Sequence, residues 1–328
     1  MTQPFVRSDV TALLAIANGP GGKRAVDVGL VDARRMMHAS RALFDAPVGA
    51  LAVMRDVGGG PCPMRLYDAR DQREPGPVLV FYHGGGFVLG DLDTHDPVCA
   101  ELARLTDLPV VAVDYRLAPE HPFPAGPDDA IAAARWVAGS PVDLGLEVTG
   151  VVPTGDSAGG TFAIVTTLAL RDEPAAAPVL AAMPFYPAAH PVKHYPSLDA
   201  FGEGYLLSRA SMGWFDECYA PDRKDWRYDP LAKPLAGLPP MIVVTASLDP
   251  IRDQGRAFAA ACIEAGVETV YQECAGTIHG FLNLRKALPS AQGDLERATR
   301  QLGLLLARSV AYEHPTSRNE EQEHSPGA

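Results

Sequence analysis

A serine lies at the centre of Gly155-Asp-Ser-Ala-Gly-Gly160, a segment that contains the pattern G-x-S-x-G. An apolar stretch, 150–153, precedes it and a helical stretch, 158–170, follows it, which predicts a tight strand-to-helix turn. Such a turn strains the serine, and its glycines leave room for the neighbouring strand and helix. The helix start directs free N–H groups and a positive dipole at a developing oxyanion. We therefore interpret Ser157 as a candidate nucleophile; the alternative is a Gly-Ser turn without catalytic importance.

A second candidate is the glycine run His83-Gly-Gly-Gly-Phe87, which directly follows the apolar stretch 78–82. Three glycines allow the backbone to present N–H groups without steric obstruction. Acyl transfer needs such donors because negative charge develops on the carbonyl oxygen. The alternative is a plain glycine turn, but its position upstream of the serine turn favours an oxyanion loop.

A serine needs a base to remove its proton, and the base needs an acid to orient it. Asp249 follows the apolar stretch 241–246, and His279 follows the expected strand 269–273. The resulting chain order of serine, aspartate and histidine is that of α/β-hydrolases. Asp253 competes with Asp249 for the role of acid, but its position predicts that it caps or begins the next helix.

The elements that must position these residues follow an alternating pattern. Short apolar runs, typical of strands buried on both faces, alternate with helical stretches from residue 78 onward, which predicts an α/β fold with a mostly parallel sheet. The expected strands are 78–82, 110–114, 150–153, 179–185 and 241–246, and the expected helices are 98–105, 128–138, 158–170 and 253–265. Upstream, 51–57 and 64–67 are expected to form strands joined by a turn at Gly58-Gly-Gly60.

The chain is expected to divide into five segments. Residues 1–48 are predicted to form N-terminal cap helices and 190–236 an aromatic-rich cap insertion over the strand ends. Residues 49–189 and 237–312 would form the core, and 313–328, which lack apolar periodicity, a disordered tail. The apolar run 11–17 only faintly imitates a signal peptide and is interpreted as an amphipathic helix.

Composition excludes several classes of function. The formal net charge of -12 disfavours nucleic acid as a partner, and no apolar run reaches the roughly 18 residues that a membrane span needs. Five scattered cysteines without a CxxC pair predict neither a disulfide framework nor a zinc site, and favour the cytoplasm. His95-Asp96 lacks a clustered partner, so no metal is expected, and no dinucleotide or other cofactor motif is present.

The motifs together resemble the hormone-sensitive-lipase-like family of α/β-hydrolases, the bacterial family IV esterases, in its GDSAG branch. The matching segments are His83–Phe87, Asp114–Ala125, Gly155–Gly160, Asp249–Arg252 and His279–Phe281. The resemblance implies an α/β-hydrolase fold, with a mostly parallel eight-stranded sheet flanked by helices and a helical cap. It implies Ser157 as nucleophile, His279 as base and Asp249 as orienting acid. The implied oxyanion donors are the N–H groups of Gly85, Gly86 and Ala158.

The resemblance also implies cis peptide bonds at Ala118–Pro119 and Phe123–Pro124, and makes a homodimer plausible. Two positions depart from the family pattern. Gln254 stands where the family often has glutamate, and Thr277 stands in a position often occupied by methionine. The first change removes a charge close to the acid, and the second adds a hydroxyl close to the base.

Further residues are expected to support the site or to line its pocket. Asp114 and Glu120 are predicted to brace the oxyanion loop by accepting hydrogen bonds from it; the alternative is a rigid loop with solvated charges. His83 and Asp156 are expected to support the site alongside them. The candidate lining of an apolar substrate pocket is Met36, Met37, Phe44, Phe87, Tyr205, Met212, Trp214 and Phe215.

The sequence thus predicts a cytoplasmic serine carboxylesterase that hydrolyses short- to medium-chain acyl esters through an acyl-enzyme. Its expected partner is a small-molecule ester, with neither nucleic acid nor a membrane involved. An amidase, an N-acyl hydrolase or a lactonase would use the same triad. A non-catalytic receptor for a small molecule is a remote alternative, which the presence of His279 disfavours.

Overall fold

A mostly parallel sheet of eight strands forms the centre of the computed structural model, which describes residues 4–313. The strands are β1 (Val53–Val57), β2 (Met64–Asp68), β3 (Gly76–Tyr82), β4 (Val110–Val113), β5 (Val148–Asp156), β6 (Met183–Phe185), β7 (Met241–Leu248) and β8 (Thr269–Ile278). Their order is β1-β2-β4-β3-β5-β6-β7-β8. Strand β2 is antiparallel to both of its neighbours, and every other pair is parallel. The predicted α/β-hydrolase architecture is confirmed.

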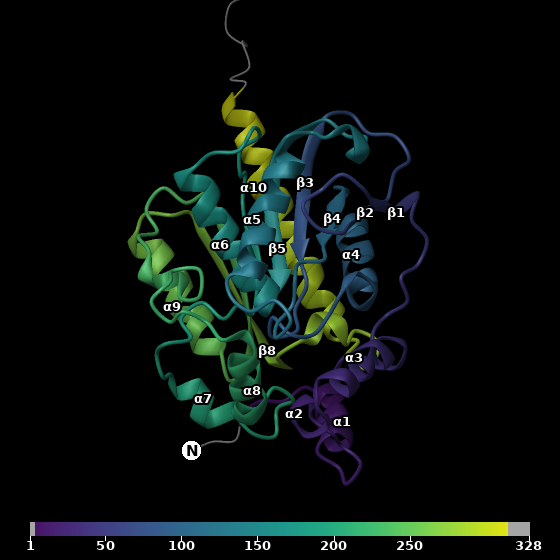
Figure 1. Cartoon of the computed structure of the whole chain (residues 1–328), viewed down its shortest axis with the longest axis vertical. Helices are drawn as coiled ribbons and strands as arrows, with labels where there is room; N and C mark the ends of the chain where they lie inside the picture. The colour runs from purple at the N-terminus through teal and green to yellow at the C-terminus, as the bar shows by residue number, and fades with distance from the viewer. Residues whose placement is uncertain (1–3, 314–328) are drawn as a thin grey trace, which may run out of the picture.

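Helices cover both faces of the sheet (Figure 1). They are α1 (Ser8–Ala17), α2 (Ala25–Val28), α3 (Leu30–Phe44), α4 (Leu92–Thr106), α5 (Ala125–Ala138), α6 (Ala158–Asp172), α7 (Pro196–Phe201), α8 (Arg209–Tyr219), α9 (Arg252–Glu264) and α10 (Ala291–Glu313). Because side chains alternate along a strand, Leu79 and Phe81 pack with α4 and α10, whereas Val78 and Val80 pack with α5 and α6. The strands are apolar on both faces for this reason.

The helices α1–α3 and α7–α8 gather at one end of the molecule (Figure 1). Helices α2 and α8 contact each other although they are far apart in the chain. Residues of α1, α3 and α8 line one cleft together with Ser157. These helices therefore cover the end of the sheet where β5 gives way to α6.

Two elements differ from their expected extents. The run 179–185 forms a strand only at β6. The residues before β6 make single bridges instead of a continuous ladder: Val179 pairs with Val151 of β5, and Ala182 pairs with Met241 of β7. Helix α4 begins at Leu92, well before the expected residue 98. The Asp91 side chain caps it by accepting a hydrogen bond from the Thr94 N–H group, while Pro97 lies inside the helix and obscured its start in the sequence.

Other expectations concern single bonds and the chain ends. The Ala118–Pro119 and Phe123–Pro124 peptide bonds are both cis, as the family resemblance implies. All five cysteines are free. Within residues 4–313, no helix has the length and apolar character needed to cross a membrane. The expected tail lies outside the described residues from position 314 onward.

Candidate active site

The serine turn joins β5 to α6 and places Ser157 in an unusual backbone conformation, with φ 55° and ψ -118°. The N–H group of Ser157 donates to the carbonyl oxygen of Phe185 at 2.9 Å, which fixes the turn against β6. A Cβ on Gly159 would lie 1.9 Å from the carbonyl oxygen of Tyr82, and one on Gly155 would lie 2.3 Å from the same atom. Only glycine fits at either position, so the pattern around the serine is a packing requirement.

Three side chains from separate strand ends form an unbroken hydrogen-bonded chain. The Oγ atom of Ser157 lies 2.8 Å from Nε2 of His279, and Nδ1 of His279 lies 2.7 Å from Oδ2 of Asp249. The other carboxylate oxygen of Asp249 accepts the N–H group of Ile251 at 2.9 Å. Asp249 is fully buried and His279 is 8% exposed. A carboxylate so placed holds the imidazole with its proton on Nδ1, leaving Nε2 to accept a proton from the serine.

The competing acid, Asp253, lies elsewhere. It belongs to the first turn of α9, accepts a hydrogen bond from the N–H group of Ser197, and pairs with Arg252 and Arg256. No hydrogen bond joins it to His279 among the described residues. The structure therefore brings Asp249, and not Asp253, together with His279.

The glycine loop turns back on itself beside the serine. Gly85 has φ 124° and Gly86 has φ 63°, and a Cβ on Gly85 would lie 2.1 Å from the carbonyl oxygen of Leu89. In the described part of the chain, the N–H groups of Gly85 and Gly86 have no protein acceptor. Ala158 is the first residue of α6, and its N–H group cannot bond within the helix. None of these three N–H groups is used by a hydrogen bond within the described part of the chain.

Buried polar contacts support the glycine loop from below. The N–H group of Gly84 donates to Oδ1 of Asp156 at 2.8 Å. The Tyr115 hydroxyl donates to the carbonyl oxygen of His83 at 2.6 Å, and the two rings stack with centroids 4.2 Å apart. Burial, and then the neighbouring His95, lower the pKa of His83 to about 4. His83 and Asp156 thus lie where the loop begins.

The prediction that Asp114 and Glu120 brace the loop by accepting its hydrogen bonds is wrong. Glu120 instead accepts two hydrogen bonds, at 2.7 and 2.8 Å, from Arg34 of α3. Arg34 also donates to the carbonyl oxygen of Val88 at 3.0 Å, so it is the arginine that reaches the loop. The Asp114 carboxylate has no hydrogen bond to the loop among the described residues, and burial raises its pKa to about 6.

The cleft beside Ser157 has a volume of about 1430 Å³. Six of the eight expected lining residues line it: Met36, Met37, Phe44, Phe87, Met212 and Phe215. The other two do not. Tyr205 packs edge-on against Phe201, and the ring of Trp214 packs against Phe215, with centroids 5.3 Å apart, outside the cleft lining.

Sequence reasoning missed three polar neighbours of the site. His95 and Asn283 contact the buried Asp156, and the ring of Tyr186 packs on His279. In the sequence, His95 next to Asp96 suggests only a metal ligand, and no clustered partner supports that role. No group of three or more His, Cys, Asp or Glu side chains is placed to hold a metal within the described residues.

A strained serine at a strand-to-helix turn, a Ser–His–Asp chain and an adjacent glycine loop with free N–H groups together characterise an α/β-hydrolase. Comparison with known proteins agrees. A family model described as alpha/beta hydrolase fold matches residues 79–283. The chain therefore belongs to the α/β-hydrolase fold family, and the relatives below confirm its resemblance to the hormone-sensitive-lipase-like esterases.

Curated relatives and solved structures extend over most of the chain. The ethyl acetate hydrolase of Pseudomonas putida is 35% identical over 277 residues, covering 80% of this chain and 86% of the relative. Esterase LipI of Mycobacterium tuberculosis is 33% identical over 310 residues, covering 92% and 94%. Carboxylic ester hydrolase LipN of the same organism is 40% identical, but the match spans only 63% of that protein. An α/β-hydrolase from the metagenome of Lake Arreo superimposes with a TM-score of 0.85 at 36% identity, covering 92% of this chain and 99% of that one.

Proposed function

We propose that this chain is a serine carboxylesterase that acts on small esters through an acyl-enzyme. The unbroken hydrogen-bonded chain from Ser157 through His279 to Asp249 carries the proposal. The curated relatives are named as ester hydrolases and esterases, and this chain is an ester hydrolase of the same family. The assignment of the three side chains to their roles is our inference from their geometry.

The geometry accounts for both halves of the reaction. The Oγ atom of Ser157 attacks the ester carbonyl while Nε2 of His279 takes the serine proton, and the charge on the carbonyl oxygen is met by the three free N–H groups. Asp249 stabilises the resulting imidazolium. When the tetrahedral species collapses, the C–O bond to the alcohol breaks and the alcohol leaves with the proton from His279. Water then attacks the acyl carbonyl and gives a proton to Nε2 of His279; the bond between the acyl carbon and Oγ of Ser157 breaks, the carboxylic acid leaves, and the proton returns to Oγ.

The surroundings of the site support further proposals. Residues 4–48 and 190–236 form a cap, because helices from both segments wall the cleft above Ser157. The apolar lining suits a short- to medium-chain acyl group. Five free cysteines, three of them buried, suit a reducing compartment, so we infer the cytoplasm as its location. A homodimer remains a proposal from family resemblance.

The decisive experiment compares Ser157→Ala with wild type on p-nitrophenyl butyrate, together with labelling by an organophosphate read by mass spectrometry. Loss of the covalent route should lower kcat by about 10³-fold or more, and the variant should take up no label. Ser40→Ala is the matched control, because Ser40 lines the same cleft but bonds only within α3. A Ser157→Ala variant with a tenth of wild-type activity would contradict the proposal. Faster turnover of the matched butyryl anilide than of the ester would favour an amidase.

A further inference from the structure

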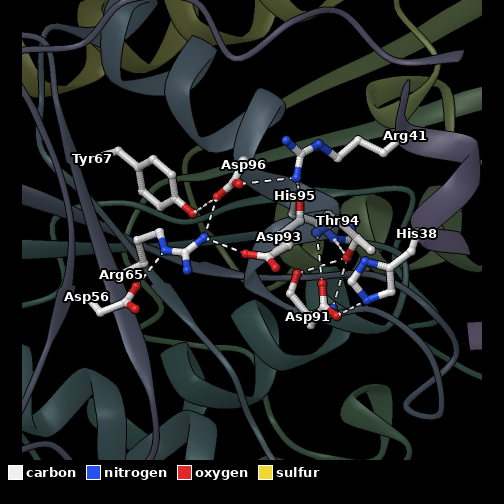
Figure 2. A network of polar contacts seen from close by, with 10 residues as sticks. All are labelled: His38, Arg41, Asp56, Arg65, Tyr67, Asp91, Asp93, Thr94, His95 and Asp96. Atoms are coloured by element: carbon white, nitrogen blue, oxygen red, sulfur yellow. Dashed lines mark hydrogen bonds and ion pairs between the residues drawn. The ribbon is translucent and has the colours of Figure 1, made fainter. Parts of the chain in front are cut away.

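His95 is a fully buried imidazole that the proposed reaction does not use. It lies in the first turns of α4, next to the capping residue Asp91. Figure 2 shows it at the inner end of a polar network that runs outward through Thr94 and Asp91 to His38 on α3. A polar ring in this position needs partners for both nitrogens, since an unpaired buried polar group is costly.

One nitrogen is anchored within α4 itself. Nδ1 of His95 lies 3.0 Å from the hydroxyl of Thr94, which donates its own proton to the carbonyl oxygen of Asp91 at 2.9 Å. The contact between this hydroxyl and Nδ1 holds the imidazole against the first turn of α4. This fixes the ring and directs Nε2 away from the helix.

The other nitrogen lies among three segments of the active site. Nε2 is 3.3 Å from the N–H nitrogen of Gly84, 3.1 Å from Nδ2 of Asn283 and 3.3 Å from Oδ1 of Asp156. Asn283 also donates to Oδ2 of Asp156 at 3.2 Å. The groups thus form one closed cluster around a single imidazole nitrogen.

Each member of this cluster adjoins a different part of the site. Gly84 precedes the two oxyanion glycines, Asp156 directly precedes Ser157, and Asn283 lies four residues after His279. The cluster also surrounds a buried carboxylate. Burial alone would raise the pKa of Asp156, but its contacts with His95 and Gly84 outweigh burial and hold that pKa below its ordinary value. His95 thus helps keep a negative charge in place beneath the oxyanion loop.

We propose that His95 is a positioning residue, whose buried ring holds the oxyanion loop, the serine turn and the His279 loop in mutual register. The inference rests on the proposed esterase function, because it concerns the same site. It predicts that losing Nε2 misaligns the oxyanion donors more than it weakens substrate binding, so kcat should fall while KM changes little. Small misplacements of catalytic groups cost on the order of 10²-fold in rate.

Three substitutions of His95 separate its two nitrogens. His95→Phe keeps a ring among Phe81 and His83 but removes both polar atoms. His95→Gln can place an amide where Nε2 lies, and His95→Asn can place one where Nδ1 lies. We expect kcat on p-nitrophenyl butyrate to fall about ten- to hundredfold for the Phe and Asn variants. The Gln variant should recover most of the loss.

The adjacent residue on the same helix supplies a matched control. Asp96 is also buried, but it bonds outward to Arg65, Tyr67 and Arg41 (Figure 2). Among the described residues, its carboxylate has no hydrogen bond to a member of the cluster. Asp96→Asn should lower the Tm and leave kcat within about twofold. His95 and Asn283 should behave as one unit, so the effects of His95→Phe and Asn283→Ala on kcat should fall well short of additive.

The experiment measures kcat, KM and Tm for all variants. It also measures the rate at which the organophosphate labels Ser157, a reaction that requires the nucleophile and the oxyanion donors but no deacylating water. An unchanged kcat in His95→Phe would overturn the inference, as would an equal loss of kcat in Asp96→Asn. If His95→Phe does not fold, the comparison of His95→Gln with His95→Asn tests the inference. Equal kcat values for these two variants would overturn it. A wild-type chain that neither hydrolyses esters nor becomes phosphonylated would overturn the proposed function as well.

Discussion

The phenol ring of Tyr186 packs on the imidazole of His279, with the two ring centroids 4.8 Å apart. The Tyr186 hydroxyl accepts a hydrogen bond at 3.3 Å from the N–H group of Leu282, in the loop that follows His279. Tyr186 has φ 34°, which is rare for a bulky residue. Backbone strain of this kind persists where surrounding structure enforces it, and it clusters at active sites. We therefore expect Tyr186 to orient His279.

Replacing Tyr186 should separate the effect of the ring from that of its hydroxyl. Tyr186→Phe loses one hydrogen bond to Leu282, worth about 0.5–1.5 kcal/mol, and should lower kcat less than tenfold. Tyr186→Leu also loses the ring contact, so its kcat should fall further. Steady-state kinetics of both variants, measured at temperatures equally far below the Tm of each, would show this difference in kcat. Equal kcat values for the two variants would mean that the ring does not orient the imidazole.

Two aspartates four residues apart should differ sharply when each is changed to asparagine. Asp249→Asn leaves the geometry but favours the wrong tautomer of His279, and should lower kcat by about 10³- to 10⁴-fold. Asp253→Asn disturbs ion pairs with Arg252 and Arg256, and should lower the Tm with kcat nearly unchanged. Kinetics and thermal unfolding of both variants test this. Similar losses of kcat would show that the orienting acid is not Asp249 alone.

His83 should make the folded state less stable in mild acid. Its pKa of about 4 in the folded chain lies below the ordinary value of 6.5, because burial disfavours the charged ring. Between these values the unfolded chain binds the proton and the folded chain does not. The stability that His83 contributes is therefore present above pH 6.5 and is lost as the pH falls toward 4. The full loss is about 3 kcal/mol.

Urea unfolding of wild type and His83→Gln at several pH values between 4 and 7.5 measures this contribution. The free energy of unfolding of wild type should fall more steeply with decreasing pH than that of the variant. His121→Gln is the control, because it removes an imidazole that is exposed. Parallel curves for wild type and His83→Gln would contradict the prediction.

The nucleophile and the glycine loop could be predicted because each lies in a short sequence motif. Only glycine fits at positions 155 and 159, because a Cβ would collide with the carbonyl oxygen of Tyr82. The pattern around Ser157 therefore predicts the geometry of the turn. Contacts between distant segments leave no such trace. Asn283 meets His95 across 188 positions, and nothing in either segment signals the other.

The same limit explains the error at Glu120. Its motif predicted a carboxylate near the oxyanion loop, and it does lie close to that region of the chain. Arg34, 86 positions away on α3, takes both carboxylate oxygens and reaches the loop itself. Because the guanidinium of Arg34 binds both oxygens of Glu120, that carboxylate accepts no hydrogen bond from the oxyanion loop within the described residues. Trp214 was predicted to line the cleft from its residue type, but its ring packs against Phe215 and stays outside the lining.

The walls of the cleft should limit the length of the acyl chain. A volume of about 1430 Å³ exceeds the roughly 300–1,000 Å³ of most ligand pockets, so volume alone sets no limit. Phe215 lies against Gly86 of the oxyanion loop, whereas the exposed Arg24, Glu203 and Arg209 also line the cleft. As the acyl chain of the substrate is lengthened, its end therefore leaves the apolar part of the cleft and reaches charged side chains that prefer water.

While the apolar part fills, each methylene contributes about 0.8 kcal/mol, or roughly fourfold in specificity. We therefore expect kcat/KM on p-nitrophenyl esters to peak at about four to eight acyl carbons, to fall steeply by about twelve, and to show no activation when the ester forms micelles. Phe215→Ala removes an apolar wall and should shift the optimum. Trp226→Ala should not, because Trp226 does not line the cleft and packs in a separate apolar cluster. A rate still rising at sixteen carbons would mean that an open apolar groove continues past the charged residues, as a true lipase requires.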